Sequence, residues 1–247
     1  MGKICFLLLF FSMTLTFSAS ASAKEPYETD IIKTSADDLK ITFIGHGTLM
    51  FTFGTKIIHV DPYTNVADFA KFPKADVILI THEHRDHLDL KALELVRTEK
   101  TKVVLTEPCS KQVKNGIIMK NGDVQTVSGL KIEAIPAYNL IHKRDDGQPF
   151  HPKGVGNGYI ITFGDKRVYV AGDTENIPEM KSLREIDCAF LPMNLPYTMT
   201  PEMVVDAATA FRPKILYPYH FGDTATSNLM KLLQDQKGIE VRIRNMR

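Results

Sequence analysis

Three histidines lie within the six residues from His82 to His87, and Asp86 stands among them. His82 and His84 are one residue apart, so in an extended backbone their side chains project in the same direction and can chelate one ion. Asp86 and His87 follow on a tightening loop and face a second position. These residue types at this spacing indicate metal binding, with one metal ion expected and room for a second.

Mixed imidazole and carboxylate ligands suit zinc, and iron or manganese remain alternatives that ligand type does not exclude. The alternative is a polar turn between a strand and a helix, in which Asp86 or Asp89 caps the helix. A cap explains one carboxylate but leaves three clustered histidines without a role. Metal binding is therefore the favoured interpretation.

The cluster stands between two elements that can position it. The apolar run 75–80 predicts a short buried strand, and the pattern over 88–96 is typical of a helix. The histidines and Asp86 therefore lie on a loop at the end of a strand, where functional side chains are commonly placed.

The stretch from Thr81 to His87 resembles the T-H-x-H-x-D-H signature of the metallo-β-lactamase superfamily. Four further motifs follow the order and rough spacing of the branch related to ascorbate-phosphate lactonases and N-acyl phosphatidylethanolamine phospholipase D. They are Gly45-His46-Gly47, Asp61-Pro62, Gly172-Asp173-Thr174 and Tyr219-His220-Phe221. The likeness runs from about Leu39 to about Phe221.

This resemblance implies a fold and completes the metal site. The fold is of class α/β (α+β), a four-layer αββα sandwich with the site at the edge where the strands of both halves end. By resemblance, the Asp173 carboxylate bridges two metals, and His220 joins Asp86 and His87 around the second. Taken alone, Asp173 could be a turn residue and His220 a satisfied histidine at a strand end.

The first metal position requires a third ligand besides His82 and His84, and here the sequence departs from most relatives. They place a histidine directly after a strand ending in Pro-Ala, whereas this chain continues Pro136-Ala137 with Tyr138-Asn139. The sub-branch with A-Y-N followed by F-H-P-K matches Phe150 to Lys153, so His151 is favoured. His142, Asn139 or no protein ligand are the alternatives.

Other residues are expected around the ligands. Asp61, at a strand end, suits the role of accepting a ring N–H from a ligand histidine, and His46 belongs to the same outer group. The segment from Tyr138 to Asn157 is expected to be a substrate lid, whose Lys143, Arg144 and Lys153 could meet an anionic group, although Asp145 and Asp146 weaken that signal. The candidates for substrate contact are Tyr138, Asn139 and Tyr197.

The rest of the chain predicts alternating strands and turns with two late helices. Strands are expected over 39–44, 49–53, 56–60, 102–106, 159–163 and 166–170, with two more within 124–135. Helices are expected over 201–211, with Thr200 as N-cap, over 226–236, and in short form over 65–72. His59, between apolar neighbours, is expected on a strand face.

The two halves of the chain share a pattern. The run from Thr52 to Lys56 recurs from Thr162 to Lys166, and three further segments recur at the same offset of about 110 residues. A weak internal duplication follows, with chance similarity of strand-turn-strand segments as the alternative.

The N-terminus has the organisation of a secretory signal. Lys3 precedes an apolar run, and small residues lead to an A-x-A site before Lys24. We therefore expect a signal peptide over 1–23 cleaved after Ala23, a flexible leader over 24–38 and a single domain over 39–247. The expected location is the periplasm or the exterior, with an uncleaved anchor as the alternative.

The charge and cysteine content limit the classes of partner that we expect. Removing residues 1–23 takes away only Lys3, which leaves 29 basic and 29 acidic side chains. A neutral chain argues against nucleic acid, and no later segment predicts stable membrane insertion, so a small-molecule substrate is expected. Cys109 and Cys188 are too few for a disulfide scaffold and are expected to be buried thiols.

The function expected is that of a metal-dependent hydrolase, with zinc as cofactor, in two copies or one, and Mn²⁺ or Fe²⁺ as alternatives. Metal-bound hydroxide would attack an ester, lactone or phosphodiester, with Asp86 and Asp173 as catalytic residues. The alternatives are a β-lactam-type amide hydrolase, a metal-dependent redox protein, and a metal-binding protein with little or no activity.

Overall fold

A computed structural model describes residues 1–2 and 27–247, so the predicted signal peptide and cleavage site lie outside the described residues. The described chain forms two seven-stranded sheets, each in sequential strand order. The first contains β1 (Glu28–Ile32), β2 (Leu39–Gly45), β3 (Thr48–Phe53), β4 (Lys56–Val60), β5 (Val77–Leu79), β6 (Lys102–Leu105) and β7 (Ile117–Ile118). The second contains β8 (Val124–Val127), β9 (Leu130–Ala137), β10 (Gly156–Phe163), β11 (Lys166–Val170), β12 (Cys188–Pro192), β13 (Ile215–Tyr219) and β14 (Glu240–Val241).

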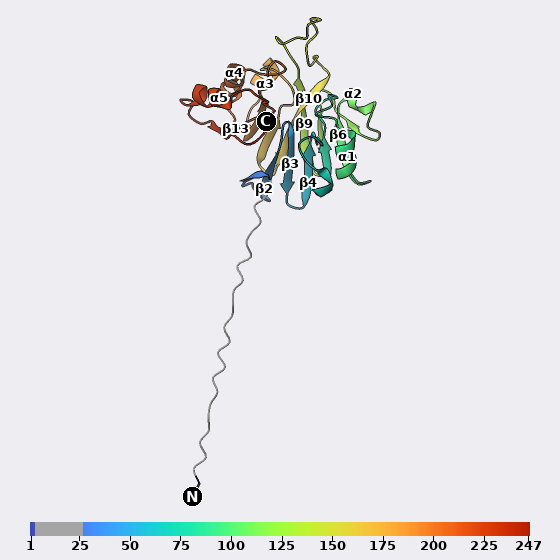
Figure 1. Cartoon of the computed structure of the whole chain (residues 1–247), viewed down its shortest axis with the longest axis vertical. Helices are drawn as coiled ribbons and strands as arrows, with labels where there is room; N and C mark the ends of the chain where they lie inside the picture. The colour runs from blue at the N-terminus through green and yellow to red at the C-terminus, as the bar shows by residue number, and fades with distance from the viewer. Residues whose placement is uncertain (3–26) are drawn as a thin grey trace.

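Helices cover the outer faces of both sheets. They are η1 (Phe69–Lys71), α1 (Leu90–Val96) and α2 (Glu107–Ser110) in the first half, and α3 (Pro178–Lys181), α4 (Pro201–Phe211) and α5 (Thr226–Leu233) in the second. Figure 1 shows α1 and α2 on one side of the molecule and α3 to α5 on the other, with the sheets between them. This is the predicted αββα sandwich.

The two sheets have the same topology. In each, the first four strands pair antiparallel and the last four pair parallel. The matching extends to side chains, because Asp76 Oδ2 accepts the Ile57 N–H at 2.8 Å and Asp187 Oδ2 accepts the Arg167 N–H at 2.9 Å. The repeated sequence pattern therefore corresponds to a repeated structure.

The main core lies between the sheets and joins both halves. Phe51 packs against Phe163 with ring centres 5.5 Å apart, and Phe43 packs against Tyr217 at 5.1 Å. Alternating apolar residues on these strands put one set of side chains into the interface. A second cluster, including Leu93 of α1, fills the space outside the first sheet.

Several predictions of local structure are confirmed. Thr200 caps α4 by accepting the Met203 N–H, with Pro201 at the first helical position. Cys109 and Cys188 are buried free thiols. His59 lies buried on β4.

Several boundaries differ from prediction, among them the end of the helix expected over 226–236, which in α5 (Thr226–Leu233) is Leu233. The leader is not loose over its whole length, since residues Glu28–Ile32 form β1, where Asp30 accepts hydrogen bonds from Tyr217, Arg242 and Arg244. These long-range bonds have no local sequence signal. The helix expected over 65–72 is reduced to η1, which begins after its N-cap Asp68.

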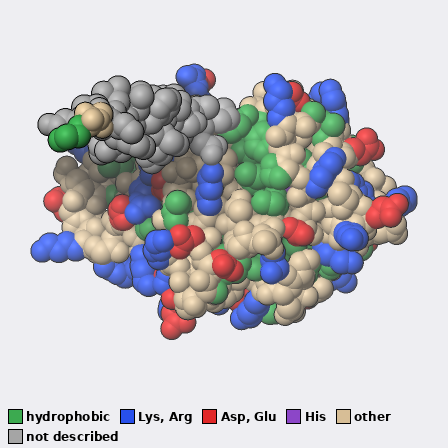
Figure 2. Space-filling model, turned by 90° about the horizontal axis from the view of Figure 1, so that it is seen from below, with side chains coloured by type: hydrophobic (Ala, Val, Ile, Leu, Met, Phe, Trp, Pro, Cys, Tyr) green, Lys and Arg blue, Asp and Glu red, His purple; other side chains and the backbone are tan. Residues whose placement is uncertain are grey.

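Among the described residues, no helix is both long and apolar enough to cross a membrane. Basic and acidic side chains are interspersed on the face drawn in Figure 2.

Candidate metal centre

The predicted ligand residues converge at one edge of the sandwich, beyond the ends of strands. The loop after β5 supplies His82, His84, Asp86 and His87. A second set comes from distant parts of the chain: Asp173 follows β11, His220 follows β13, and His151 lies on the loop between β9 and β10.

The first cluster consists of His82, His84 and His151, whose ligand atoms all lie within 4.8 Å of one another. His151 Nε2 is 3.3 Å from Asp173 Oδ2, and His82 Nε2 is 4.0 Å from the same oxygen. The favoured third histidine is thus next to the other two.

The second cluster surrounds the other oxygen of Asp173. Asp173 Oδ1 is 3.5 Å from His87 Nε2 and 3.9 Å from His220 Nε2. Asp86 Oδ2 lies 3.7 Å from His87 Nε2 and 3.4 Å from His220 Nε2. The two oxygens of Asp173 therefore face separate groups of nitrogen ligands.

The convergent atoms fit bound cations. His82 Nε2, His87 Nε2 and Asp173 Oδ1 are buried and have no hydrogen-bond partner among the described residues. An unpaired buried polar group costs about 1–3 kcal/mol, and bound metal ions would satisfy these atoms. Burial would raise the pKa of Asp173, but the imidazoles of His220 and His87 hold it well below its usual range.

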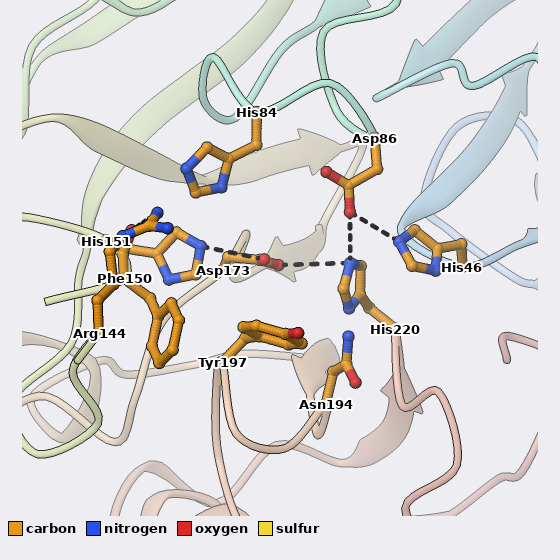
Figure 3. Close-up of a pocket in the computed structure, with 10 residues that line it drawn as sticks. All are labelled: His46, His84, Asp86, Arg144, Phe150, His151, Asp173, Asn194, Tyr197 and His220. Atoms are coloured by element: carbon orange, nitrogen blue, oxygen red, sulfur yellow. Dashed lines mark hydrogen bonds and ion pairs between the residues drawn. The ribbon is translucent and has the colours of Figure 1, made fainter.

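A cavity of about 470 Å³ opens over the two clusters. Figure 3 shows the side chains that line it: His46, His84, Asp86, Arg144, Phe150, His151, Asp173, Asn194, Tyr197 and His220. Candidate metal ligands line one part of the cavity, and Arg144, Phe150, Tyr197 and Asn194 line the rest. A concave site with convergent polar and ionisable groups is a candidate small-molecule site.

Comparison with known proteins identifies the chain. Residues 40–220 match the family model described as "Beta-lactamase superfamily domain". The UPF0173 metal-dependent hydrolase of Koribacter versatilis is 34% identical over 200 residues, which cover 74% of this chain and 84% of that protein. The one from Thermococcus onnurineus is 32% identical over 202 residues, with the same shares covered.

Solved structures agree. The crystal structure of a "putative metal-dependent hydrolase" from Parabacteroides distasonis has 52% sequence identity and a TM-score of 0.85, covering 90% of this chain and all of the other. Igni18, a metallo hydrolase from Ignicoccus hospitalis, has 25% identity and a TM-score of 0.69, covering 83% and 94%. The chain is a metal-dependent hydrolase of the metallo-β-lactamase superfamily.

In this hydrolase Asp61 orients a candidate ligand. Its Oδ2 accepts a hydrogen bond from His87 Nδ1 at 2.8 Å, and both of its oxygens also accept from Thr81, at 2.8 Å from the backbone N–H and 2.6 Å from the hydroxyl. Asp61 and His87 are fully buried. A neutral His87 with its proton on Nδ1 would direct the lone pair of Nε2 at the second cluster.

His46 contacts the same cluster from the opposite side. Its Nε2 donates to Asp86 Oδ2 at 2.9 Å, and its carbonyl accepts the His220 N–H at 3.0 Å. Burial would raise the pKa of Asp86, but hydrogen bonds from His220 and His46 hold it well below its usual range. A Cβ at Gly47 would lie 3.0 Å from the ring of His87, so the residue beside His46 must be small.

Asn139, predicted to be a substrate contact or a ligand, instead holds His151. Its Oδ1 accepts from His151 Nδ1 at 2.7 Å and from the His151 N–H at 2.8 Å. Its Nδ2 donates to Glu175 and to the Tyr197 carbonyl. Asn139 is buried and does not line the cavity. Both the oxygen and the nitrogen of its side-chain amide are engaged in hydrogen bonds within the protein.

Glu175 anchors the start of this loop and was missed by sequence reasoning. Its buried carboxylate accepts the backbone N–H groups of Leu140, Ile141 and His142, each at 2.7 Å. It also accepts from His142 Nδ1 at 2.7 Å, and His142 belongs to none of the candidate ligand groups among the described residues. In the sequence Glu175 is one acidic residue after a turn, and no local signal shows that it meets a loop over thirty positions earlier.

Of the two remaining substrate candidates, one lines the cavity and the other does not. Tyr197 lines the cavity, as expected. Tyr138 does not, since it is buried and its hydroxyl donates to Glu179 and accepts from Lys153. Asn194, which lines the cavity after β12, carries no recognisable motif and was not predicted.

Proposed function

We propose that the hydrolase uses two metal ions held by the two clusters. His82, His84 and His151 would hold the first, Asp86, His87 and His220 the second, and Asp173 would bridge them. The arrangement of Asp173 carries this proposal, because its Oδ2 lies 3.3 Å from His151 and its Oδ1 lies 3.5 Å from His87.

Zinc is the metal that we propose for both positions. Five imidazoles and two carboxylates form the ligand set, and imidazole-rich sites of this kind suit zinc, with iron or manganese as the alternatives. The orientation of the rings supports metal binding, because Asp61 and Asn139 accept hydrogen bonds from the far nitrogens of His87 and His151.

The proposed reaction is hydrolysis of an ester, lactone or phosphodiester bond in a small molecule. Bound metal ions would supply Lewis acidity and lower the pKa of water at the site. The chain itself would contribute orientation. Asp86 lines the cavity as an ionised carboxylate, and its Oδ2 is already engaged by His46. Its Oδ1 would therefore accept a hydrogen bond from the attacking water and orient it.

We further propose that the protein is exported, with a signal peptide over 1–23 and a mature chain that begins at Lys24. Support comes from Lys3, the apolar run after it and the small residues before Lys24. The first strand begins at Glu28, so cleavage after Ala23 would leave every described element in the mature protein. After cleavage, no membrane insertion and no nucleic-acid partner are proposed.

Metal content and activity test the central proposal together. Elemental mass spectrometry should find about two zinc ions per chain in the purified mature protein. It should find about one or fewer in Asp173→Asn and about one in His151→Ala. His142→Ala, which removes an imidazole from the same loop, should keep two. Zinc-loaded wild type should cleave members of a panel of 4-nitrophenyl esters, lactones and phosphodiesters. Wild-type metal content in Asp173→Asn would show that the carboxylate is not a ligand.

A further inference from the structure

Arg144 is a cation of the cavity wall that no carboxylate of the described chain neutralises. Its guanidinium carbon lies 5.2 Å from the centre of the Phe150 ring, and its Nη2 donates to the Phe150 carbonyl at 3.3 Å. Two backbone hydrogen bonds fix the loop around Arg144. The Arg144 N–H donates to the Gln148 carbonyl, and the Gly147 N–H donates to the Arg144 carbonyl. The other guanidinium donors remain available to a ligand.

Arg144 forms no ion pair with Asp145 or Asp146, its acidic neighbours in the described chain, and neither of these lines the cavity. Arg144 is the only lysine or arginine among the lining residues, and the only carboxylates are Asp86 and Asp173. Both of these lie within the candidate metal clusters. Metal ions at those clusters would engage the two carboxylates, so the charge presented to a substrate would be positive.

An aromatic wall connects this cation to the other end of the cavity. The rings of Phe150 and Tyr197 meet edge to face with centres 5.0 Å apart. Figure 3 shows Arg144 and Phe150 on the His151 side and Tyr197 between them and His220. A chain of apolar atoms can therefore lie along the rings, between the guanidinium and the metal clusters.

We infer that Arg144 is a specificity-determining residue that binds an anionic group on the substrate, a carboxylate or a phosphate, some distance from the scissile bond. Phe150 and Tyr197 contact the apolar segment that links this group to the bond. A guanidinium stacked on a ring is held in a fixed plane, and its free edge matches a carboxylate or phosphate in bidentate geometry. This inference rests on the proposed function and names its substrate class.

Three 4-nitrophenyl esters with the same scissile bond test the inference. They are the esters of hexanoic acid, which is neutral, of adipic acid, which keeps one free carboxylate, and of 6-phosphonohexanoic acid. Zinc-loaded wild type should prefer the charged esters. Arg144→Gln should lower kcat/KM for them by about tenfold or more, mainly through KM, and for the hexanoate ester by less than about twofold. The better of the two charged esters identifies the anion.

Lys143→Gln is the matched control, because Lys143 is a neighbouring cation that does not line the cavity. It should behave as wild type. An equal loss on all three esters in Arg144→Gln, or no preference for charge in wild type, overturns the inference.

Calorimetric titration gives a readout that needs no turnover. Adipate should bind zinc-loaded wild type at least about tenfold more tightly than hexanoate, and Arg144→Gln should remove that difference. If no ester is cleaved, the proposed esterase activity fails, and the subsite is judged by this titration alone. Equal affinities for adipate and hexanoate in wild type overturn the subsite.

Discussion

Replacing Asp61 by asparagine tests whether the site depends on the orientation of a ligand ring. The carboxylate accepts three hydrogen bonds, from His87 Nδ1 and from the backbone and hydroxyl of Thr81. An asparagine has one acceptor oxygen, whereas the two N–H donors require one on each side. Either Thr81 loses its backbone bond, or the imidazole of His87 adopts the other tautomer and directs an N–H at the metal.

The magnitude follows from the bond that is lost. A hydrogen bond to a charged group contributes about 1.5–3 kcal/mol, and about 1.4 kcal/mol corresponds to a factor of ten in affinity. We therefore expect Asp61→Asn to weaken zinc binding at the second position about 10- to 100-fold. Binding at the first position, where Asn139 orients His151, should change little.

Competition with a fluorescent zinc chelator resolves the two affinities. Asp76→Asn is the matched control, because Asp76 also accepts a backbone N–H in the same sheet but contacts no candidate ligand. It should bind both zinc ions as wild type does. Two wild-type affinities in Asp61→Asn would refute the reasoning, since the carboxylate would then play no part in presenting His87.

Three further predictions concern burial and packing. Burial lowers the pKa of His59 to about 4 in the folded protein, below the 6.5 of the free side chain. The unfolded chain therefore binds more protons as pH falls from about 6.5 to about 4, and stability is lost over that window. Urea unfolding at pH 7 and pH 4.5 should show that His59→Gln loses about 2–3 kcal/mol less unfolding free energy than wild type, and equal losses would contradict this. Glu175→Gln should weaken the first zinc about tenfold or more through the loop that carries His151, which a chelator titration measures; unchanged affinity would remove the anchoring role. Gly47→Ala should displace the ring of His87 and lower the affinity for zinc at the second position. Wild-type zinc affinities at both positions would show that the ring can move aside without weakening metal binding.

The sequence by itself determined the metal-binding loop and the element types around it. His82, His84, Asp86 and His87 are neighbours in the chain, so their spacing alone brings their side chains to one place. Periodic apolar residues fixed the main strands and α4, because a strand or helix repeats every two or 3.6 residues wherever it occurs. The position of Asp173 and of His220 after strands was also readable once the superfamily was recognised.

Only the tertiary structure decided which distant loops meet. Asn139 was expected to contact substrate and instead forms a hydrogen bond with His151. Glu175 accepts hydrogen bonds from a loop that precedes it by more than thirty residues. The sequence shows Arg144 as a basic residue, but it does not show its stacking on Phe150 or that no carboxylate among the described residues pairs with it. Local sequence encodes the conformation of a segment. A hydrogen bond or ring contact between distant segments depends instead on how the two packed sheets bring the ends of their strands together. The ligands nearest in sequence were therefore predictable, and the groups that orient them were not.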